Sequence, residues 1–178
     1  MVRRGHLLFI FFTALLATFG FLVFNRIKEK NTNLEQISIL PEFYFFDSLG
    51  NTVYWNDLET MEKGIVVFYV NSTCSLCQEE FSFIKNHLDD FKDAQLIFVS
   101  TEDFEDIRKF AKEFELWGRK GLTFLQDREL RFSSFFHLET VPSTLVYNAE
   151  GSLLGAFKGM VSIKKIIQLL NDGSRKES

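Results

Sequence analysis

The sequence has few of the residues that mark several common classes of protein. Its 178 residues include two cysteines and two prolines. Two cysteines are too few for a small secreted scaffold held together by disulfides. A formal net charge of −4 argues against a general nucleic-acid binder, which would carry a basic face. With 46% hydrophobic and 25% charged residues, the chain is not intrinsically disordered, and its length predicts one domain with an appendage.

One long uncharged run lies near the N terminus. Residues 7–24 contain 18 residues without a charge, of which 13 are Leu, Ile, Val or Phe. A helix of this length measures about 27 Å, close to the roughly 30 Å of a bilayer's hydrocarbon core. Its insertion is favourable by about 4–8 kcal/mol. We therefore predict a transmembrane signal-anchor over residues 1–30, with the spanning helix at 7–24.

A cleaved signal peptide is the alternative interpretation of this run. Such a peptide has an apolar core of about 7–15 residues that ends in a small-residue cleavage site. The best small pair here is Thr18 and Gly20, and apolar residues continue past it to Phe24. The pattern favours an uncleaved anchor. Basic residues flank both ends of the run, so charge alone does not orient it.

Charge divides the chain into unequal parts. Residues 1–30 carry five basic residues and one acidic residue, a net +4, which leaves −8 for residues 31–178. We expect a polar linker at 31–36, a globular domain at 37–172 and a polar tail at 173–178.

Hydrophobic patterning predicts an α/β domain. Continuous apolar runs at 65–70 and 96–100 are typical of strands covered on both faces. Apolar residues three and four apart predict helices, and these are expected at about 73–90, 102–114, 130–136 and 163–170. Further strands are expected at 43–46, 52–55, 122–125, 143–147 and 153–158. Alternating strands and helices require a parallel centre, and the closing hairpin adds antiparallel strands, so we predict a mixed β-sheet flanked by helices.

Both cysteines lie where the run at 65–70 gives way to the next helix, which Ser72 or Thr73 is expected to cap. Cys74 and Cys77 are three residues apart, so they are neighbours on a helix and can form a disulfide with little movement. A helix N terminus stabilises a thiolate at Cys74, whereas Cys77 lies one turn further in and is more shielded. This predicts Cys74 as the attacking thiol and Cys77 as the resolving thiol.

Three other interpretations of the pair are weaker. Half of a zinc site is disfavoured because His6, His87 and His137 lack ligand spacing. A purely structural disulfide would close a four-residue loop and constrain the unfolded chain little. Buried apolar cysteines do not fit a helix N terminus. The pair is thus interpreted as a redox centre.

A second candidate element is the segment 140–144, in which Pro142 opens a predicted strand. Proline is tolerated there because the first residue of a strand need not donate a hydrogen bond to the ladder. These residues alone do not decide between a cis and a trans peptide bond.

The order of these elements resembles that of a known family. A turn at 47–53, the strand leading into Cys74-x-x-Cys77, and the segment 141–147 followed by Gly151 and Gly159 occur in the same order there. From about Ile37 to Leu170 the chain is similar to the thioredoxin superfamily, and within it to the TlpA/ResA-type membrane-anchored thiol–disulfide oxidoreductases of the redoxin (AhpC-TSA-like) group. The resemblance implies a thioredoxin-like fold behind the transmembrane helix.

The resemblance also implies roles for individual residues. Cys74 matches the attacking cysteine and Cys77 the resolving cysteine, and their disulfide would be the redox group, without a further cofactor or a metal. Pro142 matches a cis-proline that faces the pair, and Val141 would present its backbone to an extended partner segment. Glu80 matches an acid that tunes thiol titration, although a solvated helix glutamate is the simpler interpretation and Glu79 lies beside it.

The sequence departs from the family at two places beside the cysteines. Thr73 stands where the family usually has tryptophan, and Ser75-Leu76 stands where it usually has a proline. The residues between the cysteines affect thiolate stability and therefore the reduction potential. The potential, and with it the direction of electron flow, stays open.

Three functions compete. The first is an anchored thiol–disulfide oxidoreductase of the bacterial inner membrane, with its catalytic domain facing the periplasm or cell exterior. It would reduce disulfides of apocytochrome c or other exported proteins and receive electrons from a membrane partner. The second is a thiol peroxidase, for which Asn71 stands where a threonine is expected, and for which Arg119 and Arg128 are candidate arginines. The third is a metallochaperone or binding module without enzymatic activity.

Overall fold

The computed structural model describes residues 2–58 and 62–175. For residues 2–8, 10, 27, 29–34, 36 and 56 it describes the backbone alone. The chain divides into two units, residues 1–36 and residues 37–178.

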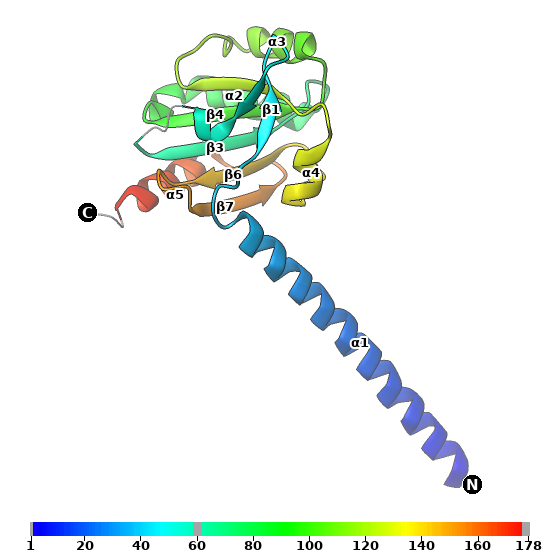
Figure 1. The fold of residues 1–178 in the computed structure, drawn as a ribbon. Helices are drawn as coiled ribbons and strands as arrows, with labels where there is room; N and C mark the ends of the chain where they lie inside the picture. Colours follow the sequence, from blue (N-terminus) through cyan, green and yellow to red (C-terminus); the bar gives the residue numbers. More distant parts are fainter. Residues whose placement is uncertain (1, 59–61, 176–178) are drawn as a thin grey trace. The chain divides into compact units, whose positions relative to one another are not determined.

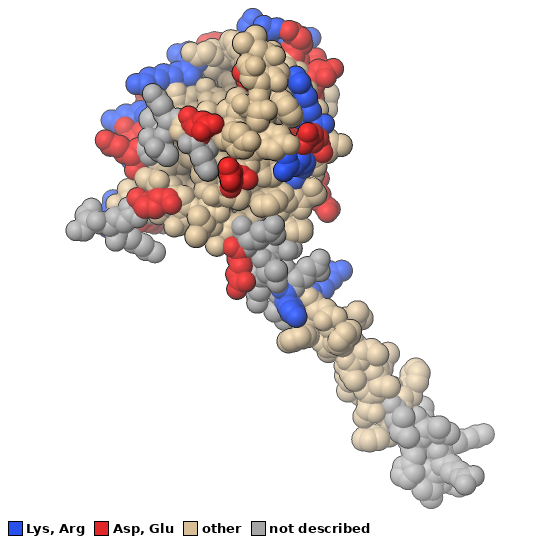
Figure 2. Space-filling model, viewed as in Figure 1, with Lys and Arg blue, Asp and Glu red and all other residues tan. Residues whose placement is uncertain are grey.

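The first unit is the greater part of one helix, α1 (Val2–Ile37). The polar linker predicted at 31–36 is part of this helix, because no glycine or proline interrupts the chain between Phe21 and Leu40. The described side chains from 11 to 26 are exposed, and most between Phe11 and Phe24 are large and apolar. Figure 2 shows a stretch without charged residues in the middle of the helix.

The structure does not show the membrane span predicted at 7–24. Within the part of the chain that it describes, no helix is long and apolar enough to cross a membrane. The side chains of Leu7, Leu8 and Ile10, which belong to the predicted span, lie outside the described residues.

The second unit contains a seven-stranded mixed sheet (Figure 1) of order β2-β1-β5-β4-β3-β6-β7. Its strands are β1 (Tyr44–Phe46), β2 (Thr52–Tyr54), β3 (Gly64–Tyr69), β4 (Ala94–Ser100), β5 (Leu122–Gln126), β6 (Ser143–Tyr147) and β7 (Leu153–Lys158). Strands β3, β4 and β5 are parallel, and β6 and β7 add antiparallel strands beside β3. On the other side, β1 pairs antiparallel with β5, and β2 with β1. The predicted mixed α/β sheet is confirmed.

The helices that follow the sheet strands are α2 (Ser75–Asn86), α3 (Phe104–Glu113), α4 (Arg131–Phe136) and α5 (Ile163–Arg175). The helix predicted to reach residue 90 ends at Asn86, and a 3₁₀ turn at Leu88–Phe91 follows it. The helix predicted to begin at residue 102 begins at Phe104.

Helix α5 extends into the predicted polar tail and ends at Arg175. Its last turns pack against β7, because Gly173 approaches Leu154 so closely that a Cβ there would lie 2.8 Å from a Leu154 methyl carbon. Residues 176–178 of the predicted tail lie outside the described residues.

The core has one layer on each face of the sheet, because side chains along a strand alternate between faces. On one face, Val66 and Phe68 of β3 pack with apolar residues of α2, α3 and α5. On the other face, Ile65, Val67 and Tyr69 pack with an aromatic cluster from β1, Trp55 and α4. The start of α2 thus lies in the layer on one face of the sheet, at the end where β3 leaves it.

Candidate functional site: a cysteine pair at the start of helix α2

The cysteine pair occupies the first turn of α2. Cys74 is the N-cap residue, in extended conformation, and its Sγ accepts a hydrogen bond from the backbone N–H of Cys77 at 3.3 Å. The cap predicted at Ser72 or Thr73 is therefore wrong by one or two residues. A cysteine at this position directs its sulfur at the unpaired amides of the helix, which favour a negative charge.

The two sulfurs differ in their surroundings. Both cysteines are free, Cys74 is half-buried and Cys77 is fully buried. Burial raises the pKa of the Cys77 thiol, and the neighbouring Cys74 and Glu80 raise it further. A partner can thus approach Cys74, whereas the buried Cys77 lies next to Cys74 and away from a partner. The roles of attacking and resolving thiol stay predictions that this arrangement allows.

Sheet register brings Val141 and Pro142 to the pair. In the antiparallel pairing of β3 with β6, Tyr69 lies opposite Ser143, so the residues before β6 lie beside those after β3. The Val141–Pro142 peptide bond is cis. The Sγ of Cys74 donates to the carbonyl oxygen of Val141 at 3.7 Å. Two residues 67 positions apart in the chain therefore share one site.

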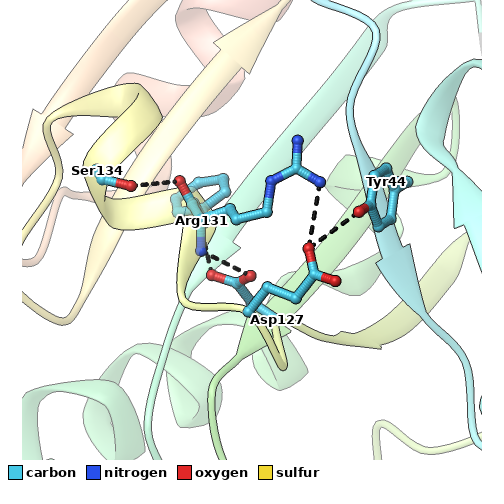
Figure 3. Close-up of polar contacts among 6 residues, drawn as sticks. Tyr44, Asp127, Arg131 and Ser134 are labelled. Atoms are coloured by element: carbon cyan, nitrogen blue, oxygen red, sulfur yellow. Dashed lines mark hydrogen bonds and ion pairs between the residues drawn. The ribbon is translucent and has the colours of Figure 1, made fainter.

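Helix α4 leads the chain into the loop at 137–142 before β6, which we call the Pro142 loop. An acidic side chain fixes the first turn of α4 (Figure 3). The buried carboxylate of Asp127 accepts the backbone N–H groups of Arg131 at 3.0 Å and Phe132 at 2.8 Å. The Arg131 guanidinium lies over the Tyr44 ring, 4.4 Å from its centre. The carboxylate at the helix N terminus ties α4 to the end of β5, and the aromatic contact ties it to β1.

Glu80 lies in the core beneath the pair rather than in solvent. It follows Cys77 by three residues, so both side chains project from the same face of α2. Glu80 is fully buried, and neither of its carboxylate oxygens has a hydrogen-bond partner among the described residues. Burial raises its pKa to about 8, and the backbone amide of Val161 opposes this rise without reaching hydrogen-bonding geometry. Its exposed neighbour Glu79 points elsewhere.

A second glutamate at the site was missed by sequence reasoning. Glu102 was expected inside a helix, but it precedes α3. Its side chain turns toward the loop at 70–74 between β3 and α2, which we call the cysteine loop. Its carboxylate accepts the backbone N–H of Ser72 at 2.7 Å and the Ser72 hydroxyl at 2.6 Å. Strands β3 and β4 are parallel, so the residues that follow them meet at the same edge of the sheet. This rule could have predicted from the sequence that Glu102 lies near the cysteine loop.

The residues proposed for the alternative functions are placed differently. Asn71 accepts hydrogen bonds from the backbone and hydroxyl of Thr73. Arg119 donates to the Glu115 carbonyl and Arg128 to the Gln126 side chain, and within the described part of the chain neither has a hydrogen bond to the cysteine loop. Among the described residues, no group of three or more His, Cys, Asp or Glu side chains is arranged to hold a metal ion.

A Cys-x-x-Cys pair at a helix N terminus, next to a cis-proline at the edge of a mixed sheet, defines the class of thioredoxin-fold thiol proteins. Residues 38–155 match the AhpC/TSA family, and the chain belongs to this redoxin family.

Several solved structures share the fold. A putative thiol:disulfide interchange protein DsbE from Chlorobium tepidum has 16% identity and a TM-score of 0.63, over 77% of this chain and 96% of that one. A putative thioredoxin from Neisseria meningitidis has 21% identity and a TM-score of 0.63, over 78% and 91% of the two chains. Peroxidoxin BcpB from Mycobacterium tuberculosis has 16% identity and a TM-score of 0.62, over 75% and 94%. No curated protein matches the sequence.

Proposed function

We propose that this protein is a thiol–disulfide oxidoreductase that reduces disulfides in other proteins through Cys74 and Cys77. The observation that carries the proposal is the asymmetry of the pair. Cys74 is half-buried, and its Sγ faces the Pro142 loop and accepts an amide hydrogen bond, while Cys77 is fully buried in the core. A two-step exchange needs this arrangement, in which one sulfur is open to a partner and the other is shielded until it resolves the mixed disulfide.

The reaction proceeds in two exchanges. The Cys74 thiolate attacks one sulfur of a partner disulfide, the partner's S–S bond breaks, and its second sulfur leaves and takes up a proton. Cys77 then attacks the Cys74 sulfur and gives its proton, through solvent, to the partner's first sulfur, which leaves as a thiol. Two electrons have passed to the partner, and Cys74 and Cys77 are joined in a disulfide. A dithiol protein returns the pair to its reduced form.

Glu80 is the candidate for tuning the second exchange. With a pKa of about 8, its carboxyl group changes charge near neutral pH, next to a thiol that must lose a proton. An ionised Glu80 raises the pKa of Cys77 and holds the resolving thiol protonated. Protonation of Glu80 removes that effect. The second exchange therefore depends on the charge of a group that never meets the partner.

We further propose that the domain is tethered to the bacterial inner membrane and faces the periplasm or cell exterior. The support is the uncharged run at 7–24 and the exposure of its described apolar side chains on α1. An oxidising compartment supplies the disulfides that the reaction consumes. Exported proteins, apocytochrome c among them, are then the substrates, and a membrane dithiol protein is the electron donor.

A thiol peroxidase is the second candidate, favoured by the family match and by the likeness to a peroxidoxin fold. The cysteine loop gives it less support, because Asn71 replaces the expected threonine and, among the described residues, no arginine side chain has a hydrogen bond to the loop.

The test is insulin reduction by the full-length protein with dithiothreitol as electron donor. Cys74→Ser should reduce the rate to background, and Cys77→Ser should accumulate mixed disulfides, because the second exchange is blocked. Full activity in Cys74→Ser would overturn the mechanism. Peroxide consumption faster than insulin reduction would favour the peroxidase. Alkylation of the pair in intact cells gives the direction, since a reductase keeps the pair mostly reduced.

A further inference from the structure

We propose that Glu102 is a positioning residue for Cys74, acting through Ser72 to hold the β3–α2 loop in the conformation that makes Cys74 the N-cap of α2. The inference rests on the proposed function and deepens it. It assigns a residue 28 positions after the cysteine to the reactivity of that cysteine.

Ser72, in the middle of the loop between β3 and α2, has hydrogen bonds to residues on two sides of the loop. The two carboxylate oxygens of Glu102 accept from the backbone and from the hydroxyl of Ser72, at 2.7 Å and 2.6 Å. Ser72 stands two residues before Cys74, and its own carbonyl accepts the side-chain amide of Gln78, in the first turns of α2, at 2.8 Å. Ser72 is thus held from the segment after β4 on one side and from α2 on the other.

Glu102 is itself fixed on its own side of the loop. The Ser100 hydroxyl lies 3.2 Å from its carboxylate, and the backbone N–H of Glu102 donates to the same hydroxyl at 3.3 Å. Its carbonyl accepts the side-chain amide of the buried Gln126, at the end of β5, at 2.9 Å. The carboxylate is therefore a rigid acceptor, anchored to the ends of two strands.

The consequence reaches the sulfur through the backbone. The Cys74 Sγ meets the Cys77 amide at 3.3 Å only while residue 74 keeps its extended N-cap conformation. Without the Glu102 bonds, Ser72 keeps its bond from Gln78 but loses its link to the segment after β4, and we expect the loop to shift and to carry the sulfur away from the helix amides. Displacement of a reacting group by about 1 Å costs on the order of 100-fold in rate. Among the described residues, Glu102 has no hydrogen bond to either sulfur, so it acts through the loop.

The experiment compares three full-length variants in the reaction of the reduced pair with Ellman's disulfide and in its equilibrium with glutathione. Glu102→Ala removes both carboxylate bonds to Ser72, and we expect Cys74 to react about 10- to 100-fold more slowly. Glu102→Gln keeps the shape and an oxygen acceptor, and should stay within about threefold of the wild type. Asp103→Asn removes one negative charge at the adjacent residue, without a bond to Ser72, and should match the wild type.

The outcomes separate positioning from other causes. An unchanged rate and glutathione equilibrium in a folded Glu102→Ala would overturn the inference. So would a loss in Glu102→Gln as large as that in Glu102→Ala, because charge rather than hydrogen bonding would then be responsible. If Glu102→Ala does not fold, Ser72→Ala takes its place, because it removes the hydroxyl bond to Glu102 and should slow Cys74 in the same assay, and an unchanged rate there would overturn the inference. The readout needs no protein substrate, so a failure of insulin reduction in the wild type would overturn the proposed function and leave this inference standing.

Discussion

Two glutamates beside the cysteine pair lie in opposite kinds of surroundings. Glu102, at the surface edge of the sheet, accepts hydrogen bonds from Ser72 and Ser100. Glu80, one turn below Cys77, is fully buried and accepts none among the described residues. A satisfied carboxylate fixes geometry, whereas an unsatisfied one keeps a titration close to neutral pH. The site therefore has a rigid side at Cys74 and a titratable side at Cys77.

The largest expected effect is on the pH dependence of stability, through Glu80. Its folded pKa of about 8 lies above its ordinary value of 4.5, so the folded state binds the proton more tightly than the unfolded state. Stability from this group is complete below pH 4.5, falls as the pH rises toward 8 and is lost above it. The difference corresponds to about 5 kcal/mol at most.

Chemical denaturation of wild type and Glu80→Gln between pH 4.5 and 8 measures this effect. We expect the wild type to lose stability relative to Glu80→Gln as the pH rises, because glutamine cannot ionise. The exposed neighbour provides the control, and Glu79→Gln should follow the wild type. Parallel curves for wild type and Glu80→Gln would show that Glu80 titrates normally, and the contrast between the two glutamates would disappear.

The next largest effect is on the free energy of unfolding, and it tests whether the face of α2 that carries Cys77 is packed into the core. Phe81 follows Glu80 and stacks on Phe110 with ring centres 4.2 Å apart. Phe81→Ala should lower the free energy of unfolding by about 3–5 kcal/mol, because it leaves a cavity in a packed layer. Phe83→Ala, on the exposed side of the same helix, is the matched control and should cost little. Equal losses in both variants in urea denaturation would contradict the assignment of the buried face.

The smallest expected effect on stability is on the Cys74 side. Ser72→Ala removes one hydroxyl bond to Glu102 and leaves the backbone bond in place. We expect a loss of about 1 kcal/mol or less in urea denaturation, since the loop is only half-buried. Ser48→Ala, in an exposed turn, is the control. If Ser72→Ala lowered the free energy of unfolding as much as Phe81→Ala, the loop would contribute to stability as much as the buried face of α2.

Local pattern was sufficient for much of the fold. The continuous apolar runs predicted β3 and β4, and the hairpin strands β6 and β7 have the predicted bounds, because alternation and burial leave a signal in consecutive residues. Helix ends were predicted less well. The cap at Cys74, the start of α3 at Phe104 and the extension of α5 to Arg175 depend on contacts with distant residues, as the approach of Gly173 to Leu154 shows.

By itself, the sequence determined the order of strands and helices, the position of the cysteine pair at a helix start and Pro142 as its partner element. Only the tertiary structure decided that Glu80 points into the core and that Glu102 binds Ser72. The physical reason is that burial and hydrogen bonding across the sheet arise from residues that are neighbours in space but not in the chain. The same two cysteines that are too few to hold a scaffold together thus become a site with two different sides.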